Sequence, residues 1–113
     1  MKYSESLKKH SDFGLVYKEG TSLANKYLVM YVRDNQLEKN RLGISVSKKV
    51  GNSIVRHRLT RLIRESYRLQ EERFKCGIDI VIIARNSAKG KDYRDIESAL
   101  IHLGHLHEII DLG

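Results

Sequence analysis

Side chains in the first half of the chain alternate with a period of two, which predicts strands over residues 26–33 and 41–47. The alternating apolar positions are Leu28, Met30 and Val32 in the first stretch and Leu42, Ile44 and Val46 in the second. Because a polar loop joins the two stretches, we expect them to pair as a hairpin with one apolar face. A short additional strand is expected at residues 21–24.

Apolar residues at spacings of three and four predict three helices. The first runs over about 11–19, with Ser11 as its N-cap. The second begins after Asn52 or Ser53 and ends before Gly77, and Asp92 caps the third. The apolar positions are Phe13, Val16 and Tyr17 in the first helix, Val55, Leu59, Leu62 and Leu69 in the second, and Tyr93, Ile96, Leu100, Leu103, His107 and Ile110 in the third.

Residues 78–84, IDIVIIA, are almost continuously apolar and rich in β-branched side chains. This pattern is typical of a strand that is covered on both faces, so we place it inside the sheet. The predicted order is α-β-β-β-α-β-α. With 113 residues and 41% hydrophobic content, the chain is expected to form a single α+β domain over residues 1–113.

The charge balance indicates a polyanionic partner. Lys and Arg outnumber Asp and Glu by 21 to 14, which gives a net charge of +7 and a pI near 9.6. Nucleic acid is the partner that this excess favours. We expect a cytoplasmic protein without a membrane partner, because no apolar run is long enough to span a bilayer and the first residues do not resemble a signal peptide.

One face of the second predicted helix is cationic. His57, Arg61, Arg64 and Arg68 recur at helical spacing opposite the apolar stripe. We expect the charge of this stripe not to be neutralised by acidic residues of the same helix. Guanidinium groups bind phosphate oxygens through two hydrogen bonds at once. Further basic residues lie at the start of this helix, where free backbone N–H groups also favour phosphate; they are Lys48, Lys49, Arg56 and Arg58.

Aromatic side chains suggest a second binding surface. In the expected hairpin, Tyr27 and Tyr31 lie beside the small residues Gly43, Ser45 and Ser47, which leaves room for a ligand. Phe13 and Tyr17 share one face of the first helix and could flank this groove. Aromatic rings of this kind stack on unpaired bases. A position in the core is the alternative for Tyr27 and Tyr31, and the core is favoured for Phe13.

The segment SVSKKVGNSIVRHRLTRLIRESYR, residues 45–68, resembles the most characteristic stretch of the bacterial ribonuclease P protein family, whose motif reads approximately R-N-R-x-K-R-x-x-R. Similarity extends, in family order, to SDFGLVYKEG at 11–20, KYLVMYVRD at 26–34 and IDIVIIAR at 78–85. The chain departs from the motif at His57, where asparagine is usual, and at Thr60, where lysine is usual.

The resemblance implies a four-stranded sheet with three helices and a left-handed βαβ crossover, as in ribosomal protein domains. It also implies a protein subunit that binds the catalytic RNA of ribonuclease P and the 5′ leader of precursor tRNA. The Mg²⁺-dependent removal of the leader would be carried out by the RNA, with no catalytic residue or cofactor in the protein. By this resemblance, the catalytic RNA would be bound by Lys48, Lys49, Arg56, Arg58, Arg61 and Arg64, and the leader cleft would contain Phe13, Tyr17 and Tyr31. The helix face adds His57 and Arg68 to the candidate RNA-binding residues, and the expected hairpin adds Tyr27 to the candidate cleft.

Other functions are less consistent with the sequence. An independent nuclease would need paired carboxylates or a histidine acid–base pair, and no such set is evident. His102, His105 and His107 do not share one helix face, so no metal site is expected. A helix-turn-helix DNA reader is disfavoured because a strand precedes the basic helix. A ribosome-associated or other structural RNA-binding protein of the same fold is the alternative function.

Overall fold

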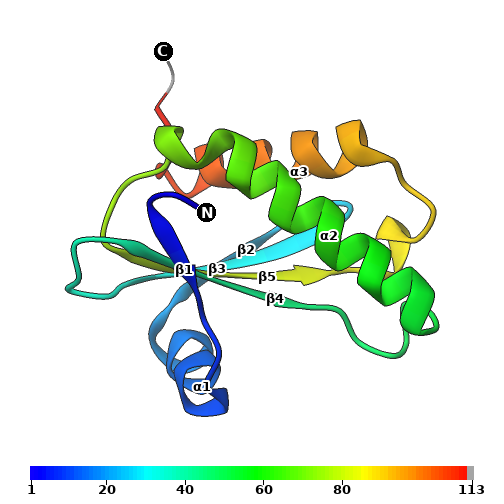
Figure 1. Ribbon diagram of the computed structural model, residues 1–113, viewed down its shortest axis with the longest axis horizontal. Helices are drawn as coiled ribbons and strands as arrows, with labels where there is room; N and C mark the ends of the chain where they lie inside the picture. The colour runs from blue at the N-terminus through cyan, green and yellow to red at the C-terminus, as the bar shows by residue number, and fades with distance from the viewer. Residues whose placement is uncertain (112–113) are drawn as a thin grey trace.

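A computed structural model describes residues 1–111 as a five-stranded sheet with α1 on one face and α2 and α3 on the other (Figure 1). The strands lie in the order β1-β4-β5-β3-β2. The helices are α1 His10–Glu19, α2 Ser53–Gln70 and α3 Tyr93–Leu106, with short 3-10 turns η1 Glu71–Arg73 and η2 Asn86–Ala88; the strands are β1 Ser4–Ser6, β2 Thr21–Ala24, β3 Leu28–Asp34, β4 Asn40–Ser45 and β5 Ile78–Ala84.

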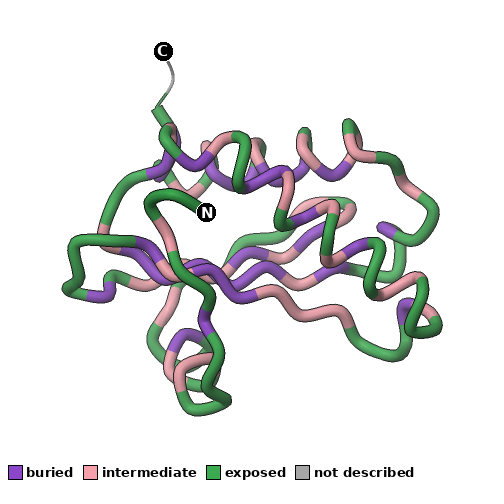
Figure 2. Tube along the Cα trace, viewed as in Figure 1, coloured by how far each residue is buried: buried purple, intermediate pink, exposed green. Residues whose placement is uncertain are grey.

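β5 lies at the centre of the sheet, as its uninterrupted apolar sequence predicts. It pairs in parallel with β4 and antiparallel with β3. One face of these strands packs against α2 and α3, where Ile80, Ile82 and Tyr67 are completely buried. The opposite face packs against α1 through Val81 and Val16. Figure 2 shows the buried positions concentrated in the central strands and on the inner sides of the helices.

The expected hairpin between residues 26–33 and 41–47 is wrong, because β5 lies between β3 and β4. Period-two alternation shows which face of a strand is buried but not which strand lies beside it. A strand covered on both faces is most stable in the interior of the sheet, and β5 occupies that position. The link from β4 through α2 to β5 is therefore a crossover between neighbouring parallel strands.

The sheet has five strands and not four, since β1 adds to the edge of β4 in parallel. Its sequence, SES, contains no apolar residue and gives no periodic signal. β1 is instead fixed by tertiary contacts: the hydroxyl groups of Ser4 and Tyr67 are hydrogen-bonded at 2.7 Å, and Leu7, one residue past the strand, is buried.

Helix boundaries agree with the sequence at two of the three caps. Asn52 Oδ1 accepts a hydrogen bond from the Val55 amide, and Asp92 forms a reciprocal capping box with Asp95. Ser11 is not a cap, because α1 begins one residue earlier at His10. Two apolar positions also differ from expectation: Leu69 is 54% exposed, and Ile110 lies beyond the end of α3, in a bridge with Phe74.

Candidate nucleic-acid interface

The outer face of α2 is cationic and exposed along its length. Leu59, Ile63 and Tyr67 are fully buried on the inner side of the helix and fix its rotation. This rotation turns the predicted basic stripe towards solvent. The exposed basic side chains on α2 are His57, Arg58, Arg61, Arg64 and Arg68.

The arginines of this face differ in their partners. Arg68 forms an ion pair with Glu65, one turn earlier, with Nε to Oε2 at 3.0 Å. The hydrogen bond from Arg68 lowers the pKa of Glu65. The expectation that no acid neutralises this stripe is therefore wrong at Arg68, because Glu65 lies three residues earlier on the same side of the helix. Within residues 1–111, Arg61 and Arg64 form no ion pair.

Lys48 and Lys49 are exposed in the turn that leads into α2. Arg56 is half-buried, and its Nε is a buried donor without a hydrogen-bond partner in the described chain. The two positions that depart from the family motif also differ from each other. His57 is exposed, whereas Thr60 is half-buried and donates through Oγ1 to the Arg56 carbonyl at 2.9 Å.

Three of the four predicted aromatic residues form one cluster on the face of the sheet that packs against α1. Tyr17 and Tyr31 meet edge to face with ring centroids 5.0 Å apart, and Phe13 lies 6.4 Å from Tyr17. Tyr17 is 40% exposed. Its pKa is raised by partial burial, although a hydrogen bond with Ser45 acts in the opposite direction. We call Phe13, Tyr17 and Tyr31 the aromatic cluster.

Gly43 does not leave the open space that was expected beside the tyrosines. In the sheet register, Val81 lies between Tyr31 and Gly43. The position above Gly43 is filled by the Phe13 ring, since a Cβ there would lie 2.7 Å from Phe13 Cε1. The small residue therefore seats one ring of the aromatic cluster against the sheet.

Tyr27 lies apart from this cluster. It precedes β3, in the turn after β2, and packs against the core on the α2 and α3 side. The ammonium groups of Lys26 and Lys91 are each 5.5 Å from the centre of its ring. The structure thus brings together only three of the four aromatic residues that the sequence grouped in one cleft.

A buried carboxylate beside the aromatic cluster was not recognised from the sequence. Asp79 on β5 is 1% exposed and accepts two hydrogen bonds from Arg41, both at 2.8 Å, and one from Asn35 at 2.9 Å. On the other side of Asp79, Arg33 Nη1 lies 3.4 Å from Asp79 Oδ2. Burial opposes ionisation, but these donors outweigh it and lower the pKa of Asp79. Cross-strand register, and not local pattern, aligns Arg33, Asp79 and Arg41.

The histidines of α3 have separate environments. His107 Nε2 lies 2.9 Å from the Met30 carbonyl oxygen, whereas His102 contacts the side chain of Asn25. Within residues 1–111, no three His, Cys, Asp or Glu side chains are grouped closely enough to bind a metal. None of the helices in this part of the chain is both long and apolar enough to cross a bilayer.

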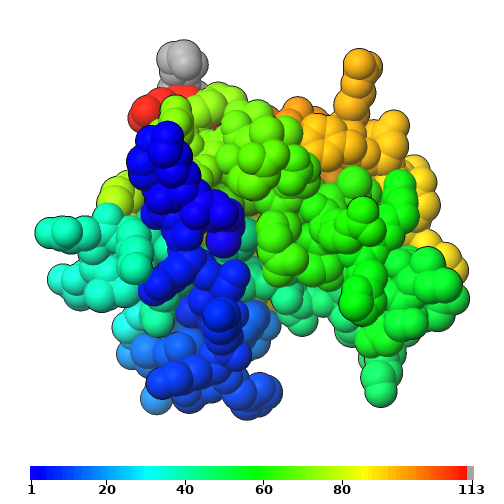
Figure 3. All heavy atoms as spheres, in the orientation of Figure 1, coloured from blue at the N-terminus to red at the C-terminus, as the bar shows by residue number. Residues whose placement is uncertain are grey.

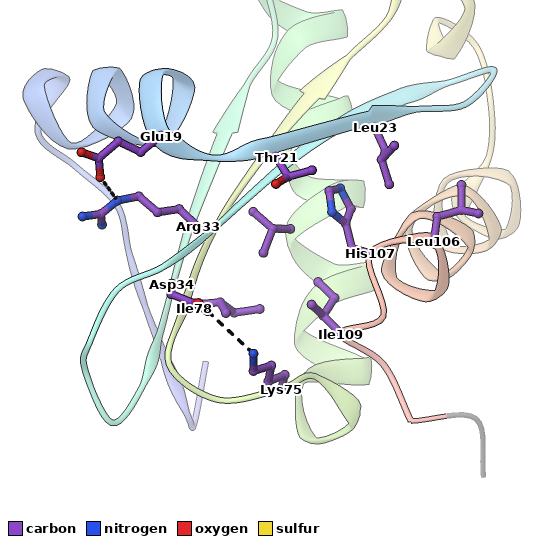
Figure 4. A pocket seen from close by; sticks show the side chains of 11 residues that line it. Glu19, Thr21, Leu23, Arg33, Asp34, Lys75, Ile78, Leu106, His107 and Ile109 are labelled. Atoms are coloured by element: carbon purple, nitrogen blue, oxygen red, sulfur yellow. Dashed lines mark hydrogen bonds and ion pairs between the residues drawn. The ribbon is translucent and has the colours of Figure 1, made fainter.

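A hollow of about 540 Å³ lies on the side where β2 and β3 meet the end of α3 (Figure 4). Its walls combine apolar side chains such as Ile78, Leu106 and Ile109 with the charged pairs Arg33–Glu19 and Lys75–Asp34. It contains none of the predicted RNA-binding or aromatic residues.

An α+β fold with an exposed row of arginines on one side of the sheet and a partly exposed aromatic cluster on the other is typical of a small RNA-binding protein. The chain belongs to the ribonuclease P protein family, since the family model for ribonuclease P matches residues 1–107. It therefore has the role of the protein subunit of ribonuclease P, an endoribonuclease in which the protein is the accessory component. This assignment disfavours the alternative of a ribosome-associated protein.

Individual relatives are similar in sequence to this chain over nearly its whole length. The ribonuclease P protein component of Lachnoclostridium phytofermentans is 66% identical over 107 residues, covering 95% of this chain and 92% of the relative. That of Alkaliphilus metalliredigens is 54% identical, and the match covers 91% of this chain and 93% of the relative. Among solved structures, the ribonuclease P protein of Staphylococcus aureus has a TM-score of 0.87 at 36% identity, covering 94% and 97%. The Thermotoga maritima protein has a TM-score of 0.80 at 36% identity, covering 87% and 93%.

Proposed function

We propose that the protein binds the catalytic RNA of ribonuclease P through α2 and binds the 5′ leader of precursor tRNA through the aromatic cluster. The observation that supports this most directly is the exposed pair Arg61 and Arg64, which lack carboxylate partners in the described chain and lie opposite the buried side of α2. Neighbouring guanidinium groups repel one another unless an anion lies between them, and a phosphate backbone supplies such anions.

The RNA-binding surface on α2 comprises Lys48, Lys49, Arg56, His57, Arg58, Arg61, Arg64 and Arg68. Contacts to phosphate position an RNA without reading its sequence. We therefore expect α2 to recognise the shape of the RNA backbone. Arg68 contributes least, because binding RNA requires it to share or leave its ion pair with Glu65.

The aromatic cluster is suited to a single strand. Bases of a single strand are free to stack, and the exposed ring of Tyr17 with the half-buried ring of Tyr31 offers faces and edges for stacking. α1 and α2 lie on opposite faces of the sheet (Figure 1), so the leader and the catalytic RNA could be bound at the same time. A left-handed β4–α2–β5 crossover belongs to this proposal, because the hand of the crossover determines which face α2 covers.

In this proposal the RNA subunit provides the Mg²⁺-dependent chemistry, and the protein increases the affinity for precursor tRNA. The site of action would be the cytoplasm. The test is reconstitution: a ribonuclease P RNA should cleave precursor tRNA at low Mg²⁺ much faster with the protein than without it. Cleavage by the protein alone, or absence of stimulation, would contradict the proposal.

A further inference from the structure

Tyr27 is the centre of a small cationic site on the side of the molecule away from the aromatic cluster. Lys26 approaches its ring from the turn between β2 and β3, and Lys91 approaches from the loop before α3. Both ammonium groups are 5.5 Å from the ring centre. Two cations drawn from distant parts of the sequence therefore share one aromatic ring.

Hydrogen bonds fix the turn that supports this site. Asn25 Oδ1 accepts from the amides of Tyr27 and Leu28 at 3.2 and 3.0 Å, and Asn25 Nδ2 donates to the Ala99 carbonyl on α3 at 2.9 Å. The Arg85 amide donates to the Tyr27 carbonyl at 2.9 Å. The backbone of Tyr27 is thus fixed to the residue after β5 and, through Asn25, to α3, without a ligand.

The two lysines of the site form no ion pairs within the described chain. Neither Lys26 nor Lys91 has a carboxylate within ion-pair distance. Asp92 and Asp95 are the nearby acids, and they hydrogen-bond to each other's backbone in the capping box of α3. The electron-rich face of Tyr27 attracts each ammonium group but cannot remove the repulsion between them. An anion bound between the two lysines would do so.

We propose that Lys26 and Lys91, positioned by Tyr27, bind one backbone phosphate of the ribonuclease P RNA. The inference rests on the proposed function, because it requires the same RNA. A lysine ammonium is a point charge suited to a single phosphate, and Tyr27 contributes by orienting both.

The RNA subunit is favoured over the leader by position. Tyr27 packs on the α2 and α3 side of the sheet, whereas the aromatic cluster lies on the α1 side. Figure 3 shows the yellow-orange segment that precedes α3 and the green start of α2 reaching the same edge of the molecule, on the right of the view. An RNA backbone that follows the start of α2 would continue towards Lys91.

The test measures the affinity of the protein for its ribonuclease P RNA, without precursor tRNA, over a range of salt concentrations. The double variant Lys26→Gln, Lys91→Gln should bind about fivefold more weakly at moderate salt, the size of one exposed ion pair. The slope of log affinity against log salt should fall by about 0.9, the increment for one neutralised phosphate. Tyr27→Leu retains both lysines and an apolar side chain, so it should weaken binding less than the double variant.

The matched control is the double variant Lys39→Gln, Lys75→Gln, which removes the same charge from lysines that pair with Glu5 and Asp34. It should bind within about twofold of the unaltered protein, because these cations are already neutralised. Equal affinities for the two double variants, or wild-type binding by Tyr27→Leu, would overturn the proposed site. A defect that appears only when a leader is present would also overturn it. If the unaltered protein itself does not bind the RNA, the result contradicts the proposed function as a whole, and with it the lysine site.

Discussion

Phe13 lies directly over Gly43, so close that a Cβ on residue 43 would come within 2.7 Å of its ring. This contact joins α1 to β4 and sets the position of one ring of the aromatic cluster. A methyl group at residue 43 would displace Phe13, because the neighbouring Leu7 side chain also lies within 3.2 Å of the same point.

Gly43→Ala should therefore lower the free energy of unfolding by about 1–3 kcal/mol, the usual cost of overpacking. It should also weaken binding of precursor tRNA. Gly14→Ala is the control, since Gly14 is exposed on α1 and its added Cβ would meet no atom within 4 Å. That change should stabilise the helix by about 0.5–1 kcal/mol. Denaturant unfolding measures both effects, and equal stabilities for the two variants would refute the contact.

Tyr31→Ala should weaken binding of precursor tRNA while affecting mature tRNA little. The expected loss is about 1–3 kcal/mol, the contribution of one base–aromatic stack. Binding affinity is compared between two holoenzymes that contain the same RNA and either the wild-type or the Tyr31→Ala protein. Each holoenzyme is tested with tRNA that carries the leader and with tRNA that lacks it. Equal losses for both tRNAs would show that Tyr31 has a structural role only.

Arg61→Ala and Arg64→Ala should reduce affinity for the ribonuclease P RNA more than Arg68→Ala does, because only Arg68 is already paired with Glu65. Each of the first two changes should lower the salt dependence of log affinity by about 0.9 if one phosphate contact is lost. All three variants should fold normally, since the side chains are exposed. Thermal unfolding provides the folding check, and a larger effect at Arg68 would contradict the prediction.

Asp79 should make the stability of the fold sensitive to acid. Because its pKa is lowered in the folded protein, its contribution is fully present above the unfolded pKa of about 3.9 and is lost as the pH falls through the folded pKa. Asp79→Asn should lower stability at pH 7 by about 3 kcal/mol, the lower end for a broken buried ion pair, because both arginines are partly exposed.

The measurement is the free energy of unfolding of both proteins between pH 7 and pH 3. The difference between them should begin to shrink as the pH falls below about 4, where the Asp79 carboxyl group of the unfolded wild-type chain takes up a proton, and it should continue to shrink towards the lower pKa of the folded protein. A difference that stays constant over this range would mean that the charge of Asp79 does not stabilise the fold.

Local patterns in the sequence determined much of this protein. The uninterrupted apolar run of residues 78–84 identified the central strand, and Asn52 and Asp92 identified two helix starts through their capping side chains. The basic face of α2 also followed from sequence, because helical periodicity fixes which residues point away from a buried stripe. Each of these features depends on residues close together in the chain.

Only the tertiary structure decided which distant residues meet. Pairing of β5 with both β3 and β4 separated the two predicted hairpin strands and aligned Asp79 with two arginines. Packing of α1 against the sheet filled the space above Gly43 with Phe13. Tyr27 and Tyr31 occupy alternate positions of one sequence stretch, yet Tyr27 lies outside β3 and packs on the other side of the sheet. Strand order and the packing of a turn depend on the free energy of the whole core, which no local period encodes.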